Sequence, residues 1–246
     1  MRYTALVLLA SGLAEASQAS HVLPVDRLVE RATGKRRNGT TWAGVIQHFP
    51  NTKTIEATWN VPHCAIHKTD VKLASTVSHW VGIDGGADCT ALLQAGMACA
   101  TYGNNEVTYY SWLEFIPKDP QALNLDVGPG DEIYAKLTAT SKTSGVFMEN
   151  RTTGKNETYS ATAEEGRPLC FTTTEWIVEE SQGHPGLWME TVRMKGCSAA
   201  NTKGTKINLD GGDIQDRVVD QKRQQRVEVQ NKNDFNILYE GRAVNN

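Results

Sequence analysis

The sequence predicts an all-β protein, built as a β-sandwich or a barrel in one domain. Three observations predict this class. Apolar and polar residues alternate with period two in several short segments. Glycine- and proline-rich turns separate these segments. From Asn38 onward, no 12-residue window carries a convincing helical stripe of apolar residues.

The clearest strand covers residues 131–140, where every second residue is apolar, as expected for a strand with one buried face. Residues 175–180 and 226–230 alternate in the same way. Residues 213–222 fit a helix and a strand equally well. The turns between the strands are expected at Gly85-Gly86, Gly128-Pro129-Gly130, Thr153-Gly154-Lys155, Gly183-His184-Pro185-Gly186 and Asp210-Gly211-Gly212.

Size and charge limit the function classes. The chain has 246 residues, 39% of them hydrophobic, which is enough for one domain with a sizeable core. Its formal net charge of -3 argues against nucleic acid as a partner held through bulk positive charge. No apolar run approaches the roughly 20 residues of a membrane-spanning helix, so we expect no membrane partner. Nothing resembles an assembly element, and a monomer is expected.

The N-terminus has the composition of a secretory signal. Residues 1–19 begin with a short basic segment, continue with a small and apolar run, and end in small residues. Residues 20–37 are expected to form a short propeptide or connector. It ends in Lys35-Arg36-Arg37, which is either a processing site or a solvated charge run. The folded domain is then expected over 38–246, in a secreted, extracellular protein.

Glycosylation and cysteine content agree with secretion. The sequons at Asn38, Asn150 and Asn156 predict glycans on the surface. The chain has five cysteines, Cys64, Cys89, Cys99, Cys170 and Cys197, which predict one or two disulfides in an oxidising compartment. The odd number leaves at least one thiol free or intermolecular.

Common catalytic motifs are absent from the sequence. It has no Gly-x-Ser-x-Gly elbow, no His-Glu-x-x-His pair and no phosphate-binding loop. His63 and His67 form at most half of a zinc site. Asp84 and the segment 210–213 hint at calcium, although Asp-Gly pairs more often make turns. We therefore expect no metal and no cofactor.

Two polar residues stand where apolar ones are expected. Gln94 follows Ala91-Leu92-Leu93, and Glu179 follows Trp176-Ile177-Val178. These two side chains either line a shared cleft or lie on solvated strand faces. The alternation alone leaves both interpretations open.

Seven sequence motifs around these residues resemble a known family. They occur in one order: Thr41-Trp42-Ala43-Gly44, Ala57-Thr58-Trp59-Asn60-Val61-Pro62, Trp80-Val81-Gly82-Ile83-Asp84-Gly85, Ala91-Leu92-Leu93-Gln94-Ala95-Gly96, Tyr109-Tyr110-Ser111-Trp112-Leu113-Glu114-Phe115-Ile116-Pro117, Thr143-Ser144-Gly145 with Glu149-Asn150-Arg151-Thr152-Thr153-Gly154, and Glu175-Trp176-Ile177-Val178-Glu179-Glu180. The series resembles the eqolisins, which are glutamic peptidases secreted mainly by filamentous fungi. The resemblance is dense to residue 180 and thin afterwards.

The resemblance implies a two-sheet antiparallel sandwich, similar to concanavalin A-like lectins, with the active site on the concave sheet. It implies a pepstatin-insensitive endopeptidase that acts on protein or peptide substrates, in this family at acidic pH. The catalytic pair falls on Gln94 and Glu179. Glu179 as a carboxylate activates water and returns its proton to the leaving amine, while Gln94 stabilises the tetrahedral intermediate.

Other residues follow from the same resemblance. The substrate groove is expected to include Trp80, Asp84 and Glu114, with Trp42 and Trp112 equally readable as core residues. A disulfide is expected between Cys89 and Cys170. One departure is Tyr110, which replaces an acidic residue that the family has near the groove. The alternative to an enzyme is a non-catalytic module on the same sandwich, lectin-like or pseudopeptidase.

Overall fold

The computed structural model describes residues 33–66, 74–86, 88–140, 142–180 and 187–241. These segments contain β-strands and no helix, as predicted. The expected signal peptide, residues 1–19, and most of the expected connector lie outside the described residues. Within the described residues, no helix has the length and apolar character needed to cross a membrane.

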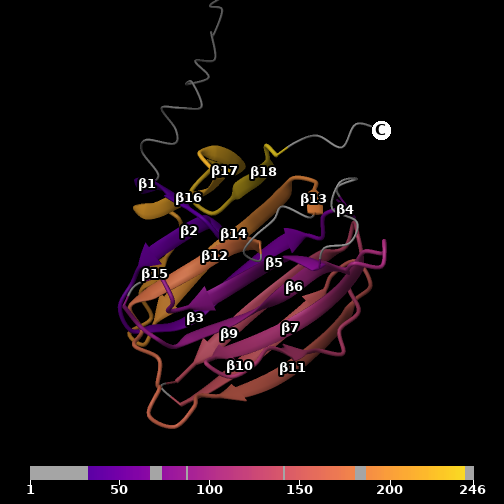
Figure 1. The fold of residues 1–246 in the computed structure, drawn as a ribbon. Helices are drawn as coiled ribbons and strands as arrows, with labels where there is room; N and C mark the ends of the chain where they lie inside the picture. The colour runs from indigo at the N-terminus through magenta and orange to yellow at the C-terminus, as the bar shows by residue number, and fades with distance from the viewer. Residues whose placement is uncertain (1–32, 67–73, 87, 141, 181–186, 242–246) are drawn as a thin grey trace, which may run out of the picture.

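Figure 1 shows the strands wrapped into two stacked layers. The strands of the described residues are β1 (Thr33–Gly39), β2 (Trp42–His48), β3 (Thr52–Asn60), β4 (Cys64–Ile66), β5 (Ala74–Ile83), β6 (Leu92–Tyr102), β7 (Thr108–Ile116), β8 (Gln121–Ala122), β9 (Glu132–Ala139), β10 (Thr143–Asn150), β11 (Lys155–Thr162), β12 (Thr173–Glu180), β13 (Leu187–Met189), β14 (Val192–Asn201), β15 (Lys206–Ile207), β16 (Gly212–Val219), β17 (Lys222–Val229) and β18 (Phe235–Tyr239). The ambiguous segment 213–222 therefore forms strands β16 and β17 and not a helix.

A single hydrogen-bonded path links both layers of the sandwich. Its order is β11-β10-β9-β3-β14-β18-β17-β16-β2-β12-β5-β6-β7-β8. The path folds back on itself, so that β3 contacts β5 and β12, β9 contacts β5 and β6, and β11 contacts β7. The strands β18, β17 and β16 form the bend between the layers. The two-sheet antiparallel sandwich is therefore confirmed, with its sheets joined at one edge.

The main core fills the space between the layers, and a second apolar cluster lies on the other face of one layer. Alternate residues of each strand point to opposite faces, so β5 sends Val77 and Val81 into the main core and Trp80 to the other side. The second cluster supports the functional face of the protein. It consists of Ile46, Trp80, Leu92, Ala98, Trp112 and Ile177.

The N-terminal strand β1 begins before residue 38, where the folded domain was expected to start. Residues 33–39 pair in parallel with β16, with Arg36 opposite Ile214. The Arg36 guanidinium donates to both carboxylate oxygens of Asp216 at 2.7 Å, and Asp216 is buried. The last residues of the expected connector, including Arg36 in the basic cluster, are thus paired with strand β16.

Two disulfides connect strands and loops. One joins Cys89 to Cys170, the pair that the resemblance implies, and the other joins Cys64 to Cys99. Cys197 is the free cysteine among the described residues, and it is buried.

The sequon at Asn150 needs a correction. Asn38 and Asn156 are exposed, as a glycan requires, but Asn150 is buried. Its Nδ2 donates to the carboxylate of Asp131 at 2.8 Å and to the carbonyl of Asp126. A glycan on this nitrogen would disrupt both hydrogen bonds, so Asn150 is not a surface position of the folded protein.

Candidate active site

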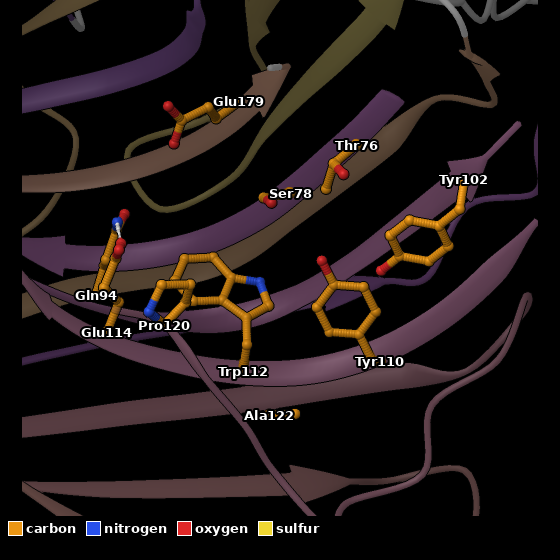
Figure 2. Close-up of a pocket in the computed structure, with 10 residues that line it drawn as sticks. All are labelled: Thr76, Ser78, Gln94, Tyr102, Tyr110, Trp112, Glu114, Pro120, Ala122 and Glu179. Carbon is orange, nitrogen blue, oxygen red and sulfur yellow. Dashed lines mark hydrogen bonds between the residues drawn. The ribbon is translucent and has the colours of Figure 1, made fainter. Parts of the chain in front are cut away.

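A cavity of about 430 Å³ opens on the face of β12, β5, β6 and β7 that points away from the main core. Figure 2 shows the side chains that surround it. They come from four neighbouring strands and from the segment around β8: Thr76, Ser78, Gln94, Tyr102, Tyr110, Trp112, Glu114, Pro120, Ala122 and Glu179. The cavity therefore brings together the two polar residues that the sequence analysis singled out.

Glu179 lies near the end of β12, on the same face as Ile177. Its Oε2 accepts a hydrogen bond from Trp80 Nε1 at 3.2 Å. The Trp80 ring in turn packs edge-on against Trp42, with ring centroids 5.0 Å apart. Figure 2 shows the carboxylate pointing toward the side of the cavity where Gln94 lies.

Burial raises the pKa of Glu179 above its usual 4.5. Hydrogen bonds from Trp42 and Trp80 oppose this shift because they stabilise the ionised form, and the nearby charge of Glu114 adds to it. A carboxylate with a raised pKa is a stronger base than a solvated one, which suits it to accept a proton from water.

Gln94 lies in β6 directly across from Glu114 in β7. Its Nε2 donates to Glu114 Oε2 at 2.5 Å, drawn as the dashed line in Figure 2. The amide oxygen of Gln94 is buried and has no hydrogen-bond partner among the described residues. An amide fixed through its nitrogen and left open at its oxygen is prepared to bind an added donor such as water or substrate.

Glu114 has a direct role in this geometry. Burial raises its pKa, whereas the hydrogen bond from Gln94 opposes the shift. The negative charge of Glu114 in turn raises the pKa of Glu179, and the charge of Asp119 adds to the raised pKa of Glu114.

The expected groove residues divide into two groups. Trp112 and Glu114 line the cavity. Trp80 is fully buried and Trp42 half-buried behind Glu179, where both donate hydrogen bonds that hold the carboxylate. The sequence did not decide whether Trp42 and Trp112 are groove or core residues. Trp112 is both, because it lines the cavity and belongs to the second apolar cluster.

Asp84 does not line the cavity. It is fully buried, with a positive φ of 68° at the end of β5. Its carboxylate accepts hydrogen bonds from the backbone N–H groups of Cys170, Phe171 and Thr172 at 2.7–2.8 Å. The expectation that Asp84 belongs to the groove is therefore corrected: Asp84 anchors the segment that leads into β12 and so positions Glu179 indirectly.

Tyr110 lines the cavity, at a position that the resemblance places near the groove. Thr76, Ser78 and Tyr102 were missing from the expected site. Thr76 and Ser78 alternate with core residues on β5, a pattern that the sequence contains, whereas Tyr102 reaches the cavity through strand pairing that the sequence does not reveal. Tyr102 is the most exposed of them, at 64%.

The residues described here offer one candidate cluster for a metal ion, formed by Asp84, Cys89 and Cys170. Its two sulfurs form a disulfide and its carboxylate is occupied by backbone donors. These three residues therefore stabilise the fold and have no ligand atoms available for a metal ion. His67, half of the pair weighed for zinc, lies outside the described residues.

An all-β sandwich with Gln94 and Glu179 at one cavity is the arrangement that the resemblance to glutamic peptidases implies. The chain belongs to the Peptidase A4 family, whose model matches residues 40–239.

Comparison with curated and solved proteins gives the same relationship. The chain is 36% identical over 143 residues to scytalidopepsin B of Scytalidium lignicola, and 37% identical over 112 residues to aspergillopepsin-2 of Aspergillus niger. These alignments cover 57% and 45% of this chain, and 52% and 39% of the two relatives. The chain thus matches about half, or less, of the length of these curated relatives.

Two solved structures extend the likeness to the fold. Scytalido-glutamic peptidase with a transition state analog inhibitor gives a TM-score of 0.69 at 27% identity, covering 82% of this chain and 100% of that chain. Aspergilloglutamic peptidase from Aspergillus niger gives a TM-score of 0.58 at 26% identity, with 67% and 98% covered.

Proposed function

We propose that this protein is a secreted acid endopeptidase that hydrolyses peptide bonds with Glu179 as the general base and Gln94 as the stabiliser of the tetrahedral intermediate. One observation carries the proposal: both side chains line a single cavity, and each is oriented by a hydrogen bond, Glu179 by Trp80 and Gln94 by Glu114.

The first step needs a base for the attacking water. Ionised Glu179 accepts one proton from the water, whose oxygen then forms a bond to the carbonyl carbon of the substrate. The Gln94 amide oxygen, buried without a partner, can accept the other hydrogen of that water and hold it in place.

The second step needs a donor for the oxyanion and a proton for the leaving group. The Gln94 amide nitrogen carries two hydrogens, of which the Glu114 bond uses one. The other is available to the carbonyl oxygen as its charge develops. Protonated Glu179 then gives its proton to the amine as the C–N bond breaks, which returns the carboxylate to its starting state.

Substrates and location follow from the same proposal. The solved relatives include glutamic peptidases bound to a peptide-based transition state analog and to the tripeptide Ala-Ile-His. We infer from this likeness that the present cavity takes a peptide in extended form. Two disulfides and the signal-like residues 1–19 support secretion.

The test is digestion of a denatured protein by the purified chain from pH 2 to 7, with pepstatin present, and mass spectrometry of the new termini. Pepstatin acts on peptidases with paired aspartates, so we expect cleavage to continue in its presence. Absence of cleavage at every pH, both before and after trimming at the residue 35–37 cluster, contradicts the proposal and favours a binding module. Culture-medium fractionation tests secretion.

A further inference from the structure

The cavity continues beyond the catalytic pair into an arm lined by hydroxyl groups. We call it the hydroxyl arm and define it by Thr76, Ser78, Tyr102 and Tyr110. We propose that the hydroxyl arm is a specificity subsite that receives one substrate side chain and selects a large uncharged one, aromatic above all. This inference rests on the proposed function, whose substrate class it names.

Strand register builds the floor of the arm. Glu179 pairs with Ser78, Ser78 with Ala98, and Ala98 with Tyr110, so that these residues form one row across four strands. Residues of such a row share one face of the sheet. The two middle members are small, which leaves a trough between the carboxylate of Glu179 and the ring of Tyr110. A side chain next to the scissile bond can lie in this trough.

The neighbouring row forms a tall wall. It runs from Trp80 through Gly96 to Trp112. A Cβ on Gly96 would lie 1.9 Å from the His79 carbonyl oxygen, so only glycine fits there, and the middle of this row carries no side chain. Trp112 and Tyr110, two residues apart on β7, therefore present two aromatic rings to the same arm (Figure 2).

A polar group at the wall points to a ligand. Trp112 is 5% exposed, and its Nε1 is buried without a hydrogen-bond partner among the described residues. In Figure 2 this nitrogen lies on the side of the indole that faces Tyr110. The Tyr110 hydroxyl itself interacts with Tyr102 and Thr76. A bound side chain with a polar edge can accept from the indole while its ring contacts Tyr110.

Charge excludes acidic and basic side chains. The carboxylates of the described lining, Glu114 and Glu179, both lie at the catalytic end. Burial raises the pKa of Tyr110, so its phenol stays neutral at any working pH. A substrate carboxylate in the trough would meet the like charge of Glu179, and an ammonium group that reached the Tyr110 end would lose its water with only neutral hydroxyl groups as partners. An aromatic ring gains edge-to-face contacts beyond its buried area.

The experiment compares peptides that differ at one residue. Cleavage sites mapped in a denatured protein give the position that contacts the arm, and kcat/KM is then measured with Tyr, Phe, Lys or Glu there. We expect Tyr and Phe to exceed Lys and Glu by about tenfold or more. Tyr110→Phe should keep this order. Tyr110→Asp should move the ratio of Lys to Phe toward Lys by about tenfold, because it places a carboxylate in the arm.

Controls separate the inference from the proposed function. Thr205→Asp adds the same charge at an exposed position between β14 and β15 and should leave the ratio unchanged, and melting temperatures verify folding of each variant. Binding of the same peptides to Glu179→Gln, followed by tryptophan fluorescence, reports on the arm even without turnover. Absence of cleavage with selective binding of aromatic peptides refutes the peptidase alone. The inference is overturned if affinity and kcat/KM do not depend on the varied substrate residue. It is also overturned if Tyr110→Asp leaves the ratio of Lys to Phe unchanged.

Discussion

Gln94 and Glu114 are cross-strand neighbours whose side chains are joined by a 2.5 Å hydrogen bond, with the Gln94 nitrogen as donor. This bond decides which end of the amide faces the open cavity. Because the amide oxygen has no other partner among the described residues, the orientation of Gln94 depends on Glu114. Glu114 is therefore a positioning residue, which acts through Gln94.

Substitution of Glu114 tests this dependence. Glu114→Ala removes the acceptor and leaves a buried amide unpaired, which costs about 1–3 kcal/mol in a buried site. We expect kcat/KM to fall by about tenfold to a hundredfold, mainly through kcat. Glu114→Gln retains an acceptor oxygen and should restore most of the activity. Equal losses in both variants, measured by steady-state kinetics on folded protein, would argue that the carboxylate contributes in some other way.

The pH dependence of activity should report on Glu179. Only the ionised form accepts a proton, so kcat/KM should fall as the pH is lowered through the raised pKa of this carboxyl. Trp80→Phe removes a hydrogen bond that favours the ionised form. The acid limb of the profile should then move to higher pH.

The matched control for that experiment is Trp188→Phe, on β13 outside the cavity lining. It should leave the acid limb in place. An acid limb that stays unchanged or moves to lower pH in Trp80→Phe contradicts the role given to the Trp80 hydrogen bond.

Stability should also depend on pH through His79. This residue is fully buried, and both ring nitrogens lack a partner among the described residues. Burial lowers its pKa to about 3, so the unfolded chain binds a proton between pH 6.5 and 3 that the folded protein does not. The free energy of unfolding is therefore unaffected by His79 titration above pH 6.5. Below pH 6.5 it decreases as the pH falls toward 3, at about 1.4 kcal/mol per pH unit.

Comparison of variants isolates this contribution, since buried glutamates such as Glu180, with its pKa raised to about 7 by burial, act in the opposite direction. The free energy of unfolding of His79→Leu, from denaturant titrations at pH 3–7, should lose less on acidification than that of the wild type. The exposed His63→Leu serves as the control. If the free energy of unfolding changes with pH equally in wild type and His79→Leu, His79 binds its proton as readily in the folded protein as in the unfolded chain, which contradicts the lowered pKa.

Strand β1 gives a contrast between two adjacent arginines. Arg36 pairs with Asp216, whose side chain is 1% exposed, whereas Arg37 pairs with the more accessible Asp213 and is itself 57% exposed. Arg36→Gln should lower the free energy of unfolding by about 1–3 kcal/mol, because it weakens the pairing of a buried charge. Arg37→Gln should change it by about 0–1 kcal/mol.

Thermal or chemical denaturation of the two variants measures this difference. Equal effects would mean that β1 contributes no buried ion pair in solution and that residues 33–37 behave as a solvated connector.

Local patterns predicted the strands well. The alternation in residues 131–140 became β9, and that in 175–180 became the end of β12. The equal fit of residues 213–222 to helix and strand was decided by pairing with β2 and β17, which no short window of sequence contains.

The site could be predicted only where sequence motifs carried it. Gln94 and Glu179 were named from their motifs, and the structure places both at one cavity. The row that links Glu179 to Tyr110 depends on the register of four strands distant in sequence. The burial of Asn150 and the backbone contacts of Asp84 likewise depend on segments distant in sequence.

The most direct test of the central claim is kcat/KM of Glu179→Gln beside that of Glu157→Gln, an exposed glutamate on β11. Glu179→Gln keeps the shape of the side chain but removes the base, so kcat/KM on an optimal peptide should fall by at least ~10²–10⁴-fold at every pH, with an unchanged melting temperature. Glu157→Gln should match the wild type. Retention of wild-type kcat/KM in purified Glu179→Gln would contradict the assignment of Glu179 as the general base.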